Sequence, residues 1–179
     1  MIGRNWALFG AAALALALAG CGRSSREEAA AAYCPQPLTV QDASRLTRFK
    51  PGAGRDPRDV VYEAALVGTA VACSVKRGAM DVSLYMRVAV NAGPSVGAGV
   101  SSVPYFVRVI DSSGAVVQGR EFYADFKLSQ TNPRGLSQEE LTLTLPFNQV
   151  AEVSGYRIAV GLKPTQEELD YNRRAQVRQ

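Results

Sequence analysis

The sequence has no histidine, only three cysteines and a single tryptophan among its 179 residues. Without histidine the chain lacks the usual general base, the usual catalytic triad and the commonest metal ligand. Its 20 basic and 16 acidic residues leave a net charge of +4, far below the concentrated basic charge typical of nucleic-acid binding. We therefore expect no metal, no cofactor and no nucleic-acid partner, and we expect the chain not to be an enzyme.

Long hydrophobic runs are also missing. The longest, residues 6–19, is too short to cross a bilayer as a helix, and Arg4 is the only charge in residues 1–20. The run ends in small residues followed by Cys21, which is typical of an export signal with its cleavage site. The order Leu18-Ala19-Gly20-Cys21 resembles the lipobox of bacterial lipoproteins, and this resemblance implies cleavage before Cys21 and acylation of that residue. The alternative is an ordinary cysteine after an ordinary signal peptide.

Several acyl chains on Cys21 would hold the mature protein on a membrane for practical purposes permanently. Gly22 stands where lipoproteins kept at an inner membrane often carry aspartate, so we expect a periplasm-facing protein of the cell envelope, at the outer rather than the inner membrane. The expected organisation is a signal peptide at 1–20, a lipidated tether at 21–32, one β domain at 33–163, and a short helix and tail at 164–179.

With Cys21 acylated, Cys34 and Cys73 remain as a pair. Two thiols in an oxidising compartment form a disulfide by default, so the sequence predicts a bridge between them. Two separate buried thiols are one alternative. A redox pair is the other, although the Cys-x-x-Cys spacing of such pairs is absent.

Apolar and polar residues alternate in several segments, as expected for strands with one buried face. The clearest runs from Val82 to Val90, and the other expected strands cover 38–40, 60–66, 70–75, 105–110, 116–128, 141–147 and 156–162. A break is expected near Gly68 and a bulge near Gly119. About seven to eight strands joined by short turns predict an all-β, antiparallel, immunoglobulin-like sandwich. A small closed β-barrel is the alternative.

The chain ends in a segment with helix signals. Thr165 and Glu168 have the spacing of a capping box, and acids in the first turn with arginines in the last favour a short helix. We expect Leu169 to be the main contact of this helix with the sandwich, with Tyr171 as a further contact.

Residues 42–59 are the most charged part of the chain, and we expect them to form a loop. Its candidate binding residues are Arg45, Arg48, Phe49, Lys50, Arg55 and Arg58. Arginines on such a loop can bind phosphates or carboxylates of lipopolysaccharide or lipid headgroups. The alternative is a solvated loop whose arginines pair with its own aspartates. Phe49 fits either a core position or an exposed anchor.

Acidic pairs are the remaining source of catalytic chemistry, and they occur at 27–28, 139–140 and 167–168. Each pair also has an adequate structural role in a tether, a strand or the first turn of a helix. Aromatic residues cluster on two of the expected strands, at Tyr105, Phe106, Phe122 and Tyr123. Packing explains most of them, and an exposed contact surface is the alternative.

Several short motifs together form a pattern: Cys34-Pro35, Ala43 to Phe49, Pro51-Gly52, Gly54-Arg55-Asp56, Cys73, Pro104 to Val107 and Glu167 to Arg174. The pattern resembles a group of uncharacterised lipoproteins of alphaproteobacterial cell envelopes, over nearly all of the mature chain. This resemblance implies an envelope location and a single domain, and it transfers no functional residue. The expected function is a non-enzymatic binding or assembly module with an envelope protein, glycan or lipopolysaccharide as partner. The alternatives are a carboxylate-dependent enzyme acting on envelope polymers and a purely structural spacer.

Overall fold

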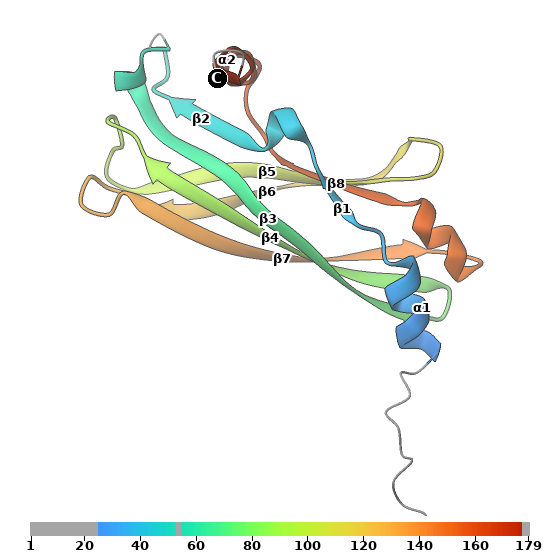
Figure 1. Ribbon diagram of the computed structural model, residues 1–179. Helices are drawn as coiled ribbons and strands as arrows, with labels where there is room; N and C mark the ends of the chain where they lie inside the picture. Colours follow the sequence, from blue (N-terminus) through green and yellow to red (C-terminus); the bar gives the residue numbers. More distant parts are fainter. Residues whose placement is uncertain (1–24, 53–54, 177–179) are drawn as a thin grey trace, which may run out of the picture.

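The computed structural model describes residues 25–52 and 55–176 of the chain (Figure 1). The expected signal peptide, the expected lipidation site Cys21 and the last three residues therefore lie outside the described residues. In the part of the chain that is described, no helix has the length and apolar character needed to cross a membrane.

In the described part of the chain, eight strands form two four-stranded sheets. The first sheet has the order β1 (Pro37–Thr39), β8 (Arg157–Leu162), β5 (Val100–Ile110) and β6 (Val116–Lys127). The second has the order β2 (Arg45–Phe49), β3 (Val60–Lys76), β4 (Ala79–Ala92) and β7 (Arg134–Pro146). Within the described residues no strand pairing joins the two sheets. The predicted all-β, immunoglobulin-like sandwich is confirmed, and the closed barrel is wrong.

The chain crosses between the sheets after β1, after β4, after β6 and after β7, so β7 returns to lie beside β4. This is a Greek-key connection, the usual one in β-sandwiches. One pairing differs from the antiparallel prediction, because β1 runs parallel to β8. A parallel pair requires a long connection between its strands, and β1 and β8 are separated by nearly the whole domain.

The core is built most regularly by β4. Its inward side chains, from Met80 through Val90 at every second position, are 0–1% exposed, as the alternation predicted. In β3 the expected break near Gly68 is a bulge within one continuous strand, between Leu66 and Gly68. The bulge expected near Gly119 is present and lies at Val117, where the register shifts between Val109 and Ile110 of the partner strand β5.

Two expectations about exposure and boundaries are wrong. β8 was expected to bury one face, but all residues from Ile158 to Leu162 are buried. β8 lies between β1 and β5, and its outer face is covered near Gly161, where a Cβ would be 2.8 Å from the Cβ of Ala43. The strand expected at 141–147 begins earlier in the structure, because β7 starts at Arg134, which pairs with Asn91 of β4.

The expected charged loop at 42–59 is also wrong in part. Arg45–Phe49 forms β2, which pairs with β3 and buries Leu46 and Phe49. The buried positions do not alternate strictly, because the register shifts between Arg48 and Phe49. A strand with this irregularity and two arginines lacks the period-two signal, so local pattern alone did not predict it.

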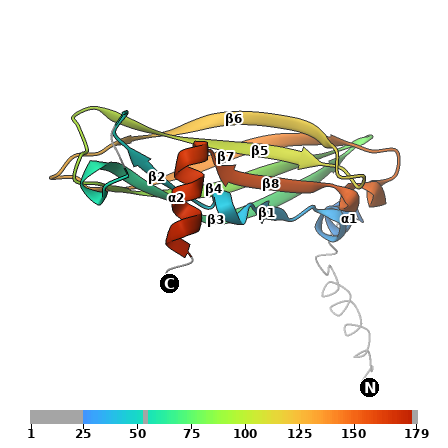
Figure 2. The same cartoon turned by 90° about the horizontal axis from the view of Figure 1, so that it is seen from above.

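Two helices pack at different places on the sandwich (Figures 1 and 2). Helix α1 (Ser25–Tyr33) occupies part of the expected tether and buries Ala30 to 5% exposure. It lies near the hairpin between β3 and β4, at one end of the long sheet (Figure 1). Helix α2 (Gln166–Gln176) lies beside β2, toward the other end (Figure 1).

The predicted capping box of α2 is confirmed. The backbone N–H of Glu168 donates to Oγ1 of Thr165 at 3.3 Å, and the backbone N–H of Thr165 donates to Oε2 of Glu168 at 2.8 Å. Leu169, however, is only half-buried, whereas Glu168 and Asn172 are 3% and 8% exposed. The helix therefore docks through buried polar side chains, which no apolar pattern could reveal, and also through the expected contact Tyr171, whose ring meets that of Phe49.

Candidate functional site

Helix α2 covers the free edge of β2. Nδ2 of Asn172 donates to the backbone carbonyl of Arg45 at 2.9 Å, which satisfies an acceptor that an edge strand otherwise leaves unpaired. The guanidinium of Arg173 donates to Oδ2 of Asp42 from Nη2 at 2.8 Å and from Nε at 3.0 Å. These contacts hold the helix against the strand that carries the first predicted binding residues.

Three of the predicted binding residues are turned toward α2. Nε of Arg48 lies 3.3 Å from Oε1 of the buried Glu168. Phe49 is 5% exposed, and its ring meets the ring of Tyr171 edge-on with centroids 5.0 Å apart. The guanidinium of Arg55 stacks over Phe49 at 5.1 Å and pairs with Glu167. Phe49 is thus a core residue beneath the helix, and it is not an exposed anchor.

The other three predicted binding residues are exposed. Arg58 is paired with Asp56, its Nη2 lying 2.9 Å from Oδ2. The hydrogen bonds from Arg58 lower the pKa of Asp56 from 3.8 to about 2. Lys50 and Arg45 extend from β2 and its end, and no hydrogen bond or ion pair among the described residues engages their side chains. The six predicted residues therefore do not form one surface, because half of them hold α2.

Tyr62 of β3 lies under this region and is 4% exposed. Its hydroxyl donates to the backbone carbonyl of Ser102 at 2.7 Å, which links the second sheet to β5 of the first. Burial raises the pKa of Tyr62, and the nearby Arg48 partly offsets this rise. The phenol is therefore a structural hydrogen-bond donor in the sandwich.

A cavity of about 590 Å³ opens beside α2, on the outer face of β2, β3 and β4. Its walls are Gln41, Ser44, Arg45, Leu46, Thr47, Glu63, Ala64, Ala65, Ala89, Asn91, Tyr171 and Asn172. Apart from Arg45, sequence reasoning did not select these residues. In the sequence, the small residues Ala65 and Ala89 each lie two positions from a polar residue, Glu63 or Asn91. Only the register of β3 with β4 shows that these four residues are neighbours on one face of the sheet.

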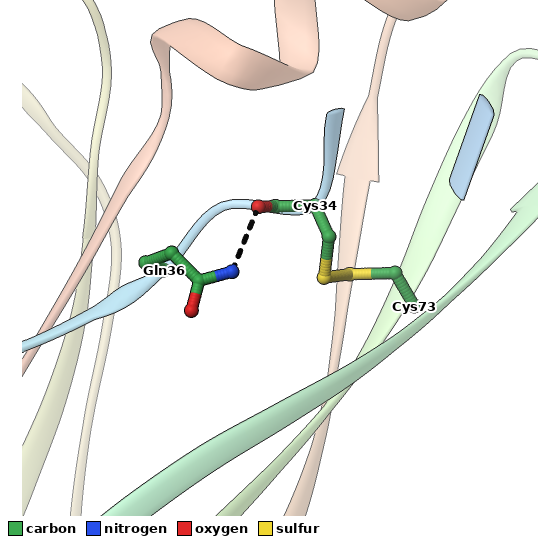
Figure 3. The surroundings of a disulfide bond; sticks show 3 residues. All are labelled: Cys34, Gln36 and Cys73. Atoms are coloured by element: carbon green, nitrogen blue, oxygen red, sulfur yellow. Dashed lines mark hydrogen bonds between the residues drawn. A yellow bond between two sulfur atoms is a disulfide. The ribbon is translucent and has the colours of Figure 1, made fainter. Parts of the chain in front are cut away.

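The disulfide predicted between Cys34 and Cys73 is confirmed, with their Cα atoms 5.8 Å apart (Figure 3). Cys73 lies near the hairpin end of β3, and Cys34 directly follows α1. Nε2 of Gln36 donates to the backbone carbonyl of Cys34 at 3.4 Å (Figure 3). The bridge therefore fixes the N-terminal helix to the same end of the sandwich as the β3–β4 hairpin.

The acidic pairs are placed in separate parts of the fold. Glu139 faces inward and accepts hydrogen bonds from the hydroxyls of Tyr105, at 3.1 Å, and Ser137, whereas Glu140 is exposed. Glu167 and Glu168 bind the arginines that hold α2. In the described ranges, no group of three or more potential metal-ligating residues occurs. Burial and the carboxylate of Glu139 raise the pKa of Tyr105.

The aromatic residues of β5 and β6 are divided between the two faces of their sheet. Tyr105 is 2% exposed and stacks on Phe122, with ring centroids 5.3 Å apart. Tyr123 is 66% exposed, and Phe106 lies under the guanidinium of Arg108 at 5.1 Å. The inner pair packs the core, and the outer pair is spread on a surface that includes the ion pair of Lys163 with Glu121.

No protein-family model and no curated protein matches this chain. One solved structure with a local likeness is that of a β-glucuronidase from glycoside hydrolase family 2, with 17% sequence identity and a TM-score of 0.31. The match covers 46% of this chain and 8% of that chain, so this chain spans a small part of the length of that enzyme. A likeness at this level carries no information about activity or ligand.

Proposed function

We propose that this chain is a lipid-anchored protein of the bacterial cell envelope and that its sandwich is a non-enzymatic binding or assembly module. The proposed anchor is Cys21, and the proposed position is periplasm-facing, at the outer membrane. The supporting sequence features are the short apolar run and the Leu18-Ala19-Gly20-Cys21 order before the domain. The proposed partner is an envelope protein or an envelope glycan.

The observation that carries this proposal is the position of α1 relative to α2. Ser25, the first residue of α1, is four residues from Cys21, a separation of at most about 14 Å in an extended chain. Because α1 is clamped to the β3–β4 hairpin end by the Cys34–Cys73 bridge, an acylated Cys21 would keep that end near the membrane. The part of the sandwich with α2, Lys50 and the cavity would then face away from the membrane, toward partners.

The roles of the acids favour binding over catalysis. Glu168 and Glu167 are engaged by Arg48 and Arg55 in holding α2, and Glu139 accepts hydrogen bonds inside the sandwich. These carboxylates have structural partners, and those of the pairs at 139–140 and 167–168 do not converge on one cavity. A binding module needs only exposed, stably positioned side chains, which the outer face of the second sheet supplies.

The anchor is tested by mass spectrometry of the purified N-terminus and by membrane fractionation. We expect an acylated Cys21 as the first residue and release of the Cys21→Ser variant from the membrane fraction. An uncleaved and unmodified N-terminus on a cytosolic protein would contradict the anchor. The Cys34→Ser variant is the matched control, because it leaves the proposed acylation site intact.

The binding role is tested by cross-linking in the cell from a photoreactive residue at Lys50, near α2, and from one at Arg77, on the β3–β4 hairpin. Both side chains are exposed. We expect a specific envelope component to be captured from Lys50 but not from Arg77. Identical patterns from both positions, or no captured component from either, would overturn the binding role.

A further inference from the structure

The outer face of the second sheet carries two rows of side chains that strand register places side by side. Thr47, Glu63, Asn91 and Arg134 form one row across β2, β3, β4 and β7. Arg45, Ala65, Ala89 and Leu136 form the next row. The small residues Ala65 and Ala89 make a low floor between Arg45 of β2 and the exposed Leu136 of β7.

A second cavity, of about 390 Å³, continues this floor along β3 and β4. Its walls are Gly68, Thr69, Ala70, Tyr85, Arg87 and Gln138. Arg87 is two positions from Ala89 on the same face of β4, a distance of about 7 Å along a strand. The two cavities therefore follow one another along one face. We call the walls of these two neighbouring cavities together the outer trough.

Gly68 shapes the centre of the outer trough. A Cβ at this position would be 3.3 Å from Nη2 of Arg87, so the guanidinium lies across the glycine, close to the strand. The bulge between Leu66 and Gly68 brings Gly68 opposite Arg87 in the register. The absence of a side chain here leaves room for the Arg87 guanidinium against the strand.

Several polar side chains in the walls of the outer trough have no partner among the described residues. Across residues 25–52 and 55–176, no hydrogen bond or ion pair engages the side chains of Arg45, Glu63 or Asn91 in the first cavity. The same holds there for Tyr85, Arg87 and Gln138 in the second. Their donors and acceptors are therefore available to a ligand, whereas the acids and arginines beneath α2 are already paired.

The side chains of the outer trough define the chemistry of its ligand. At the first cavity, β3 is paired with β2 on one side and with β4 on the other, so this part of the trough presents no free strand edge to which an extended peptide could add. The floor consists of alanine and glycine and lacks the large apolar pockets that side-chain recognition requires. The walls contain the carboxylate of Glu63 and the guanidiniums of Arg45 and Arg87, so charge of one sign is not concentrated as it is in a phosphate site.

Amide, carboxylate and guanidinium groups are planar, and each can form two hydrogen bonds to neighbouring polar atoms of a ligand. Adjacent hydroxyl groups of a sugar ring provide such pairs, and the exposed side of the Tyr85 ring offers a flat surface for the C–H face of a sugar. We propose that the outer trough binds an oligosaccharide, with Glu63, Asn91 and Gln138 among its hydrogen-bonding residues and Tyr85 as its stacking residue. This inference rests on the proposed function and specifies the glycan as the ligand.

The test is calorimetric titration of the full-length chain in detergent with a panel of neutral tetrasaccharides of hexoses and N-acetylhexosamines. The site variants are Tyr85→Ala and Asn91→Ala. The matched controls are Tyr123→Ala and Lys127→Ala on the outer face of the other sheet, where both side chains are exposed. We expect at least one tetrasaccharide to bind and each site variant to weaken it about tenfold, as for one lost hydrogen-bonded contact, while the controls do not.

Urea unfolding of each variant separates lost binding from lost folding, because a folded variant keeps a cooperative transition. Equal affinities in site and control variants would overturn the location of the site. Absence of binding to every tetrasaccharide, or binding only of extended peptides from a hexapeptide library, would overturn the glycan. Capture of a protein partner from Lys50 in such a case would show that the proposed function stands and that this inference alone has failed.

Discussion

Glu168 and Arg48 form a largely buried ion pair, in which Oε1 of Glu168 lies 3.3 Å from Nε of Arg48 and the two side chains are 4% and 28% exposed. The second oxygen, Oε2, accepts the backbone N–H of Thr165 at the start of α2. One carboxylate thus caps a helix and binds that helix to a strand far away in the sequence. The position of α2, and with it one wall of the outer trough, depends on this residue.

Replacing Glu168 tests this dependence. We expect Glu168→Ala to lower the free energy of unfolding by about 2–4 kcal/mol, because it removes the cap and leaves Arg48 without its counter-charge. Glu168→Gln should cost less, since glutamine can keep the capping hydrogen bond. The matched control is Glu167→Gln, whose side chain is 74% exposed and pairs with Arg55 at the surface. We expect Glu167→Gln to change the free energy of unfolding by less than about 1 kcal/mol, as measured by urea unfolding. An equal loss of stability in all three variants would contradict the role of Glu168.

Breaking the disulfide should destabilise the whole domain. The bridge joins residues separated by 39 positions, and closing a loop of that length restricts the unfolded chain by about 4 kcal/mol. We therefore expect the Cys73→Ser variant, or reduction of the native chain, to lower the urea midpoint by an amount that corresponds to this energy. The Cys21→Ser variant should keep the native midpoint. Rapid alkylation of two thiols in the folded, unreduced chain would contradict the bridge.

Two glycines in the loop between β4 and β5 provide a matched pair. A Cβ on Gly93 would be 2.2 Å from the backbone oxygen of Val60, whereas a Cβ on Gly97 would meet nothing within 4 Å. Gly93→Ala must displace backbone and should cost about 1–3 kcal/mol, as overpacked substitutions do. Gly97→Ala should be neutral or slightly stabilising, because it restricts the unfolded chain. Thermal unfolding of both variants measures the difference, and equal midpoints would contradict the close approach.

Acid should weaken the fold through three aspartates. Hydrogen bonds from Arg58 lower the pKa of Asp56 from 3.8 to about 2. Hydrogen bonds from Lys76 and Thr144 lower the pKa of Asp81. The pKa of Asp111 is lowered by several hydrogen bonds, and the side-chain hydrogen bond from Ser113 contributes most. Folding lowers the pKa values of these aspartates, so their ionised forms stabilise the folded state. This stabilisation is present above pH 3.8 and is lost as the pH falls toward about 2. We expect the free energy of unfolding to fall across that interval.

This acid dependence is measured by urea unfolding at a series of pH values. The Asp56→Asn and Asp111→Asn variants should each show a smaller fall than the native chain, because each has lost one titrating group. A stability that stays constant from pH 4 to pH 2, or variants that follow the native curve, would contradict the assignment of these pKa shifts.

The features that the sequence predicted well depend on neighbours along the chain. The alternation from Val82 to Val90 specified β4 and its buried face, since a strand that buries one side needs an apolar residue at every second position. The box formed by Thr165 and Glu168 specified the start of α2, because its partners are three residues apart. The count of cysteines specified the disulfide without any knowledge of its geometry.

The candidate site was less predictable, because its contacts are long-range. Arg48 was expected on a loop, either as a binding residue or paired with an aspartate of that loop, but its carboxylate partner is Glu168, at the other end of the domain. The neighbours of Glu63 in the outer trough, Thr47 and Asn91, come from two other strands and are set by the register. A shift of one residue in the pairing of β3 with β4 would turn each of these side chains to the opposite face.

The order of residues alone determined that this protein is a strand-rich domain with a disulfide and a C-terminal helix. The alternation of apolar residues and the helix cap depend on residues close together in the chain, and the disulfide was predicted from the number of cysteines without any geometry. Only the tertiary structure decided which arginines are exposed and which hold α2, and which small residues face Tyr85 and Asn91 across the second sheet. Those outcomes depend on the register of paired strands and on a helix docked across more than 100 residues of chain, which no local pattern encodes.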